Sequence, residues 1–462
     1  MSMFRGMFAA PAPRRRGGGQ RMTTTDAAAI GRSALAKASR RLLPLLGLGY
    51  GVAYMDRVNI SFAALRMNAD LHFSATVYGL GGGLFFLAYA VLEIPSNLVL
   101  ARVGARRWIA RIMITWGLLA AAMMFVRTPS QFYVMRFLLG AAEAGFFPGA
   151  VFYLMRWFPA AHRGRAISGF YIAYPLSNVF MGMAAGVLLG LHGRLGLAGW
   201  QWLFLAEGLP AVALSLVFLL FLPDEPATAP WLTDQEKAWI ADGLAADRAA
   251  LAHEPDPGLK ATLLSPLVIG MGLVNLLSLG GYYAFSLSAP AVLTQYTGLG
   301  VTPVGLLVAA AGLLGGGAMV LVSRRSDRLN ERYLHVAAPL TIVGLAFAVM
   351  ALAHPPIVTM ISYLVAQTAY SAAAAVIWLI PSDRLSGRSA AGGVAAIGAI
   401  GMIGSFLAPY GWGLLKDATG GYAAGLLALP ALFFVAAAIV LWLRASVRRG
   451  AARAHRALPV DL

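Results

Sequence analysis

Long apolar stretches alternate with short polar segments along the whole chain. A helix that crosses a bilayer needs about 20 mostly apolar residues, and stretches of that length recur throughout. The pattern therefore predicts an all-α integral membrane protein with twelve transmembrane helices. Their expected limits are 42–62, 76–99, 108–126, 131–154, 166–190, 200–222, 266–290, 302–322, 334–353, 357–380, 390–414 and 422–443.

The longest polar segment divides these helices into two groups of six. Residues 41–222 and 263–443 form halves of nearly equal length, joined by a cytoplasmic linker at 223–262. In this linker, Thr233 followed by Glu236 has the spacing of a capping box and predicts a short amphipathic helix. Equal halves favour a duplication into pseudo-symmetric repeats, an arrangement known among transporters.

The distribution of Lys and Arg predicts the orientation. Apart from Arg57 and Arg136, which fall inside predicted spans, nearly all basic residues lie on one side of the predicted membrane, which the positive-inside rule assigns to the cytoplasm. Both termini then lie there, residues 1–40 as a disordered basic tail and 444–462 as a second basic tail. The N-terminal tail lacks an apolar region before residue 42, so it is not expected to be a cleavable signal peptide. The outer segments hold Arg66, Arg127, Arg194 and Lys416.

Composition agrees with a membrane protein and argues against catalytic, metal and cofactor sites. The chain is 59% hydrophobic and 12% charged, far from the values of a soluble globule. Its net charge of +17 is explained by orientation, so no nucleic-acid partner is expected. With no Cys, no intramembrane His pair and no HExxH or GxSxG set, we expect no enzyme, no catalytic residue, no metal and no cofactor.

Charged residues inside the predicted spans are the main functional candidates, because each costs about 2.5–3.5 kcal/mol on insertion scales. Asp56 and Arg57 lie in the first span, and Arg136 and Glu143 share one face of the fourth. The two Arg residues are expected at a similar depth, where guanidinium forks would clamp a carboxylate. A mutually neutralising structural lock is the alternative interpretation.

The acids of this group suggest proton coupling. Protonation of Asp56 or Glu143 would free an Arg for a substrate carboxylate, and departure of the substrate would return the Arg to the acid. The proton is then the coupling ion. Glu93 and Glu207 also fall in spans, and for them we favour helix packing or gating hydrogen bonds.

The depth and spacing of other polar groups make them candidates as well. Tyr54 and Tyr89 are candidates for phenol hydrogen bonds to an anion, and Tyr174 belongs to a polar stripe on the fifth span. Two similar cytoplasmic loops, 97–107 and 323–333, suggest a repeated gating motif. Its candidate residues are Arg102, Arg106, Asp327 and Arg328.

The chain resembles the anion:cation symporter branch of the major facilitator superfamily. The resemblance rests on MDRVNISFAAL (55–65), LEIPSNLVLARVGARRWIARIMITWG (92–117), RFLLGAAEAGFFPGAVFYLMRWFP (136–159), GWQWLFLAEGLPAV (199–212) and WLTDQEKAW (231–239). It implies a carrier that imports organic carboxylates with protons, in the inner membrane of a bacterium and as a monomer.

The resemblance also implies roles for single residues. It assigns Asp56 and Glu143 to proton coupling, Arg57 and Arg136 to substrate binding, and Tyr54 and Tyr89 to substrate contact.

Two departures from the branch affect these expectations. Ala101 stands where the superfamily's loop pattern has Asp, although Asp327 keeps that Asp in the second loop. The eleventh helix has Gly398 and Met402 where many relatives carry Asn, which makes this side of the site less polar. An aromatic or small carboxylate is therefore favoured over a polyhydroxylated sugar acid. Polar and aromatic candidates that remain on the tenth helix are Gln367, Tyr370, Ser371 and Trp378.

Two other functions stay open at this point. A non-transporting receptor for an organic acid should lack titratable acids beside the Arg residues. An exporter or antiporter of the same fold would move the carboxylate in the opposite direction. A proton-coupled symporter is the favoured hypothesis.

Overall fold

The computed structural model describes residues 24–252, 258–353, 355–385 and 389–457. Within these residues every regular element is helical. The first half contains α1 (Thr24–Asp70), α2 (Ala75–Val103), α3 (Ala105–Ala122), η1 (Met123–Phe125), α4 (Pro129–Glu143), α5 (Phe146–Met155), α6 (Ala160–Tyr171), α7 (Ala173–Leu189), η2 (Arg194–Gly196) and α8 (Gly199–Phe221).

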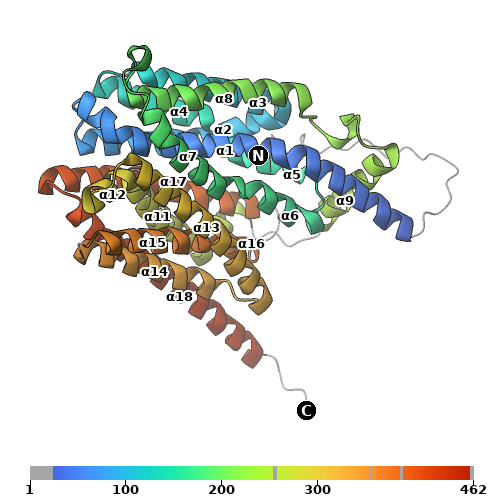
Figure 1. The fold of residues 1–462 in the computed structure, drawn as a ribbon. Helices are drawn as coiled ribbons and strands as arrows, with labels where there is room; N and C mark the ends of the chain where they lie inside the picture. The colour runs from blue at the N-terminus through green and yellow to red at the C-terminus, as the bar shows by residue number, and fades with distance from the viewer. Residues whose placement is uncertain (1–23, 253–257, 354, 386–388, 458–462) are drawn as a thin grey trace.

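The second half follows a helical linker. The linker contains η3 (Pro226–Thr228), α9 (Asp234–Ala252) and α10 (Leu259–Leu263). Figure 1 shows the first half in blue to green above the second half in yellow to red. The helices of the second half are α11 (Pro266–Ser286), α12 (Ala289–Thr297), α13 (Val301–Leu329), α14 (Tyr333–Leu352), α15 (Pro356–Ile377), α16 (Leu379–Ser382), α17 (Ala390–Thr419) and α18 (Ala423–Ala457).

Eleven helical segments of the described chain are long and apolar enough to cross a membrane. They correspond to eleven of the predicted spans, with α4–α5 and α6–α7 each forming one segment. The remaining prediction, 42–62, lies within α1, where Asp56, Arg57 and Asn59 lower the mean hydropathy of the helix. Because α1 packs along α7 and α8, it is the twelfth member of the bundle.

The expectation of a disordered tail over residues 1–40 is wrong for residues 24–40, which form the first turns of α1. The linker helix α9 holds this extension, because Ser33 and Lys37 donate hydrogen bonds of 2.6 and 2.9 Å to the Glu236 carboxylate. Glu236 also forms the capping box with Thr233, with bonds of 2.8 and 3.2 Å. Residues 1–23 lie outside the described part of the chain.

The two halves meet tightly at the outer ends of their helices. α2 packs on α17, and Gly79 and Gly83 approach the backbone of Pro409 and Phe406 so closely that a Cβ would overlap it. Small residues permit such backbone contact between membrane helices. Asp417 on α17 adds a polar seal, because its carboxylate accepts the Ala75 and Thr76 N–H groups at the start of α2 (3.0 and 2.7 Å).

The same face of α2 is exposed in its cytoplasmic half. Ile94 lies within about 20° of Gly83 around the helix axis, and it is 56% exposed. In Figure 1 the two groups of helices lie close together at one end and spread apart toward the end where α1 begins. The halves are therefore closed on the outer side and separated on the inner side, which is an inward-facing arrangement.

Candidate functional site

A buried ion pair between α1 and α4 forms the centre of the site. Nη2 and Nε of Arg57 lie 2.6 and 2.8 Å from Oε1 of Glu143, so both arms of the guanidinium contact one oxygen. The Glu143 side chain is fully buried, and that of Arg57 is one-tenth exposed. The other oxygen, Oε2 of Glu143, has no hydrogen-bond partner. The pair is thus buried, and one oxygen of its carboxylate is left without a protein partner.

The backbone after Glu143 explains how α4 presents this acid. The helix ends at Glu143, and Gly145 has φ +92°, a left-handed conformation that side chains rarely adopt. A Cβ on Gly145 would also overlap the Ser96 hydroxyl of α2. The single predicted span 131–154 is therefore interrupted directly after its acid.

Arg136 shares an aromatic ring with Arg57. Its guanidinium carbon lies 4.8 Å from the centroid of Phe85, and that of Arg57 lies 5.7 Å from the same centroid. Arg136 is buried, and its Nε has no hydrogen-bond partner. The structure therefore brings the two Arg residues together inside the first half, with the Phe85 ring contacting both.

Asp56 is the second buried acid of the cluster. Its Oδ1 accepts a long hydrogen bond of 3.4 Å from Asn59, and its Oδ2 has no partner. The charges of Glu143, Arg136 and Arg57 all act on Asp56. Two guanidiniums and two carboxylates thus lie in one low-dielectric region, where the sum of their charges is zero.

Tyrosine side chains lie where the two halves meet. Tyr54 and Tyr174 contact edge to face at 4.4 Å, and Tyr282 stacks on Tyr370 at 4.2 Å with an interplanar angle of 8°. The hydroxyls of Tyr174 and Tyr282 lie 3.3 Å apart and connect the first half to the second. The Arg57 guanidinium lies over the Tyr89 ring, with its carbon 4.9 Å from the ring centroid.

Sequence reasoning did not select Tyr282 or its neighbour Tyr283. Tyr283 contacts Phe86 across the halves, with ring centroids 4.1 Å apart. The signal in the sequence was the GlyGlyTyrTyr run at 280–283, in a span that carries no charge. Sequence reasoning missed this run because the span has no charged residue to mark it.

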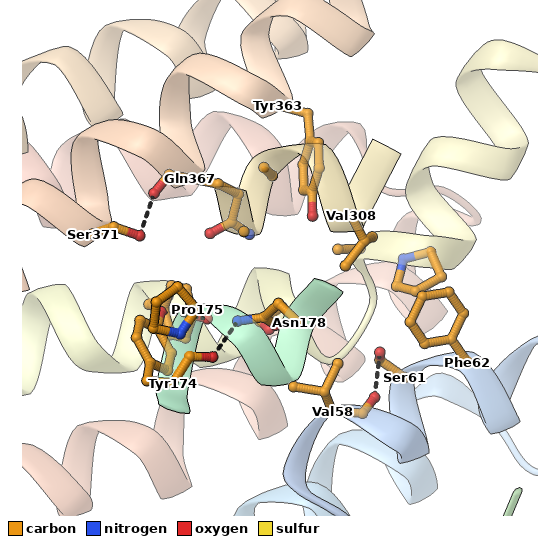
Figure 2. Close-up of a pocket in the computed structure, with 16 residues that line it drawn as sticks. Val58, Ser61, Phe62, Tyr174, Pro175, Asn178, Val308, Tyr363, Gln367 and Ser371 are labelled. Carbon is orange, nitrogen blue, oxygen red and sulfur yellow. Dashed lines mark hydrogen bonds between the residues drawn. The ribbon is translucent and has the colours of Figure 1, made fainter. Parts of the chain in front are cut away.

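A cavity adjoins the tyrosine contact, since Tyr174 and Tyr282 both line it (Figure 2). It is small, with about 30 Å³ of space, which holds one or two water molecules, and it has no charged residue in its lining. Tyr174 and Gln367 belong to this lining, whereas Trp378 does not and is 38% exposed at the end of α15. The polar groups of the lining are Ser61, Tyr174, Asn178, Tyr282, Ser286, Tyr363, Gln367 and Ser371.

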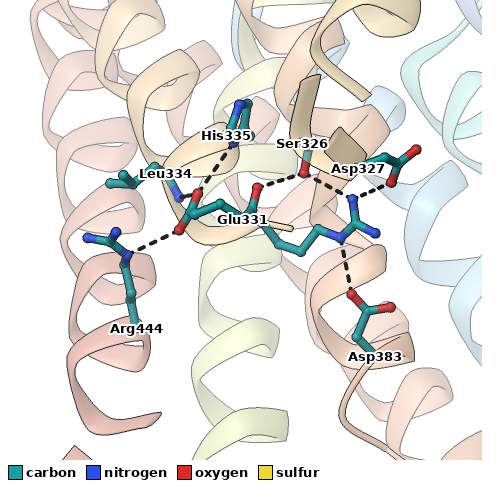
Figure 3. Close-up of polar contacts among 8 residues, drawn as sticks. Ser326, Asp327, Glu331, Leu334, His335, Asp383 and Arg444 are labelled. Carbon is teal, nitrogen blue, oxygen red and sulfur yellow. Dashed lines mark hydrogen bonds and ion pairs between the residues drawn. The ribbon is translucent and has the colours of Figure 1, made fainter. Parts of the chain in front are cut away.

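The repeated loops differ in their polar contacts. In the second loop, Arg332 pairs with Asp327 and lies 3.1 Å from Asp383, which ties α13 to the segment after α16 (Figure 3). Arg106 is the counterpart of Arg332, but Ala101 offers no carboxylate there. The backbone N–H of Arg106 donates to the Asp224 carboxylate at 2.9 Å. Arg102 and Arg328 are exposed, and their gating role stays a prediction.

Two helical halves around a buried charge cluster, sealed on one side only, define a membrane carrier. The sequence pattern described as Major Facilitator Superfamily matches residues 46–409, and the chain belongs to this superfamily. The expected fold and family are confirmed, and so is the prediction that the chain is not an enzyme, because the family and its relatives are transporters. The chain is a multi-pass membrane protein.

Curated relatives match nearly the full length. A protein of Agrobacterium vitis named "Putative tartrate transporter" is 43% identical over 414 residues, covering 89% of this chain and 91% of the relative. The "Quinolone resistance transporter" of Acinetobacter baumannii is 38% identical over 386 residues, covering 84% and 89%. The solved structure of the xylose transporter XylE from E. coli superposes with a TM-score of 0.71 at 14% identity, covering 88% of this chain and 97% of that one, which shows the fold alone.

Proposed function

We propose that the protein is a secondary transporter that carries an organic carboxylate together with protons across a bacterial inner membrane. The observation that supports this most directly is the ion pair of Arg57 with Glu143, with Arg136 beside it on the Phe85 ring. A substrate carboxylate has the same shape and charge as the Glu143 carboxylate. It would therefore compete with Glu143 for the same guanidinium.

Charge balance supplies the physical reason for coupling. The cluster of Arg57, Arg136, Asp56 and Glu143 is neutral without a substrate, so an anion that enters alone adds an uncompensated buried charge. Protonation of Glu143 or Asp56 removes that charge and releases a guanidinium at the same time. Binding of the anion and binding of a proton thus favour each other, which is the thermodynamic requirement for symport.

The surroundings of the cluster favour an aromatic acid or a small dicarboxylate. Two guanidiniums match two carboxylates, while the rings of Tyr54, Tyr89 and Tyr174 offer flat apolar surface. The relative from Agrobacterium vitis, named for tartrate, supports a small diacid. The uncharged polar groups around Gln367 would contact the neutral part of the substrate once the halves move apart there.

Transport requires the outer seal to open as the inner side closes. The contacts that must separate are the backbone approach of α2 to α17 and the Asp417 cap on α2. Rocking of one half against the other, as in alternating access, would accomplish this within a monomer.

The relative named for quinolone resistance favours a second candidate, in which the same site exports a carboxylate in exchange for protons. The sign of the driving gradient separates the two. A symporter accumulates substrate in proteoliposomes when the outside is acidic, whereas an antiporter does so when the inside is acidic.

Uptake of labelled tartrate and benzoate by purified protein in proteoliposomes tests the proposal. We expect accumulation of at least one of the two with an acidic outside, abolished by a protonophore. Uptake that is indifferent to the pH gradient would contradict proton coupling. Binding of either acid without any uptake would indicate a receptor.

A further inference from the structure

The Tyr78 hydroxyl joins the two halves close to the outer end of α2. The side chain is 5% exposed, and its hydroxyl contacts two backbone carbonyls. The hydroxyl oxygen lies 2.7 Å from the carbonyl oxygen of Leu287 in the second half and 3.2 Å from that of Ile60 in the first half. Tyr78 therefore contacts both halves, although it is not part of the charge cluster.

The two carbonyls compete for one proton, because a phenol carries a single O–H group. The distance of 2.7 Å to Leu287 is ordinary for an O–H···O hydrogen bond, whereas 3.2 Å to Ile60 exceeds the usual range of about 2.5–3.0 Å. Leu287 therefore accepts the proton in this state. Ile60 lies inside α1, where its carbonyl already accepts a backbone N–H, so Tyr78 contacts only its second lone pair.

The Leu287 carbonyl needs a donor from outside its own helix. It lies at the break between two helices, since α11 ends at Ser286 and α12 begins at Ala289. Carbonyls at the end of a helix have no N–H donor within that helix. Leu287 is also 3% exposed, so its carbonyl would be buried and unpaired without Tyr78. The Tyr78 hydroxyl thus stabilises the closed outer side.

The ring of Tyr78 places this hydrogen bond beside the charge cluster. It stacks on Phe132 of α4, with ring centroids 6.4 Å apart and an interplanar angle of 15°. Phe132 precedes Arg136 by four residues, so it lies one helical turn closer to the outer end of α4. Phe132 is fully buried, and a Cβ on Gly81 of α2 would overlap its ring. The hydrogen bond therefore lies between the charge cluster and the outer surface.

We infer that Tyr78 is a latch of the outer gate and that its hydroxyl exchanges acceptors in each transport cycle. With the outer side closed, it donates to Leu287 and joins the halves. When the outer side opens, Leu287 moves away with the second half, while Ile60 stays beside Tyr78 in the first half. The hydroxyl then donates to Ile60, so that opening leaves no buried donor unpaired. The inference rests on the rocking of the halves in the proposed function, and not on the substrate or the proton.

The variant Tyr78→Phe tests the latch, because it removes the hydroxyl and keeps the ring that stacks on Phe132. The chain contains no Cys, so a single Ala311→Cys reporter can be labelled without background. Ala311 lines the cavity between the halves and is 4% exposed. With an impermeant maleimide added outside intact cells, we expect labelling about tenfold faster in Y78F, because one buried hydrogen bond changes an equilibrium by roughly that factor.

The matched control is Tyr153→Phe, which removes an equally short hydrogen bond that does not join the halves. Tyr153 donates to the Pro223 carbonyl at 2.7 Å, at the start of the linker. This variant should label at the wild-type rate, even if its melting temperature falls. Labelling of Y78F at the wild-type rate would overturn the latch. An equal acceleration in Y153F would overturn it too, because the effect would then be general loosening.

Replacing Tyr78 with 4-aminophenylalanine restores a donor at the same place. Its amino group has two N–H bonds, enough for both carbonyls at once. This protein should label no faster than the wild type, and faster labelling would overturn the latch. The variant decides the matter if Y78F does not fold, because it keeps the buried carbonyl of Leu287 paired.

The labelling experiment is independent of the substrate, because it needs neither a carboxylate nor a pH gradient. If the wild type transports no carboxylate but Y78F labels faster, the proposed substrate fails and the latch stands. If uptake is proton-driven but Y78F labels like the wild type, the latch alone fails.

Discussion

Replacing Arg57 with Lys tests the carboxylate clamp, because it keeps the charge and removes the fork. Nε and Nη2 of Arg57 lie 2.8 and 2.6 Å from one carboxylate oxygen of Glu143. A substrate carboxylate in the place of Glu143 would meet the same two donors. Lys offers a single compact ammonium on a flexible stem, so it cannot reproduce both bonds.

The expected loss can be estimated from these contacts. One hydrogen bond to a charged group contributes roughly 1.5–3 kcal/mol, so R57K should bind substrate about 10- to 150-fold more weakly. The packing of the guanidinium over Tyr89, at 4.9 Å, would be weakened in addition. We expect uptake at low substrate concentration to fall by a similar factor while the protein still folds.

Affinity is measured by thermal shift or calorimetry with purified protein, and transport by uptake in proteoliposomes. The exposed outer-loop variant Arg194→Lys makes the same change outside the site and should leave both readouts unchanged. Wild-type affinity and uptake in R57K would refute the clamp, since the charge alone would then suffice.

Three further outcomes are expected. Asp417→Asn removes the charge that caps α2 and weakens the contact that closes the outer side, so it should shift the protein toward the outward-facing state, seen as faster cysteine labelling at an introduced outer-interface position; unchanged labelling would argue against the cap as a seal. Burial opposes ionisation of Glu236, but the bonds from its neighbours, including Lys37, outweigh it and lower its pKa to about 2, so Glu236→Gln should lower the melting temperature at neutral pH. This difference from the wild type should shrink as the pH falls below about 4.5 toward 2, because the stabilisation is present above the unfolded pKa and is lost on protonation; a pH-independent difference would contradict it. Gly145→Ala should cost about 1–3 kcal/mol, because φ +92° strains any Cβ and the new atom meets Ser96, and a thermal melt equal to the wild type would refute that.

Most of the fold could be predicted from the sequence because the patterns that specify it are local. Apolar stretches of fixed length predict spans, and the Thr233–Glu236 spacing predicts a cap, without knowledge of distant residues. The extension of α1 over residues 24–40 was missed because its helix is held by α9, some 200 residues away. The break at Gly145 was missed because membrane spans tolerate glycine, and its φ depends on packing against α2.

The site could be predicted in part for the same reason. Rare charges within apolar spans identify Asp56, Arg57, Arg136 and Glu143 directly. Their pairing is a property of the folded bundle, since Arg57 could equally have met Asp56 beside it. The tyrosine contact through Tyr282 joins the two halves, and no local pattern reports which rings meet there.

Glu143→Gln in proteoliposomes tests the central claim most directly, namely that substrate and proton exchange at one guanidinium. The amide can still accept a hydrogen bond from Arg57, but it cannot bind and release a proton. The account predicts that E143Q loses accumulation driven by a pH gradient while it retains counterflow exchange of labelled carboxylate. Gradient-driven accumulation by E143Q at the wild-type level would contradict it.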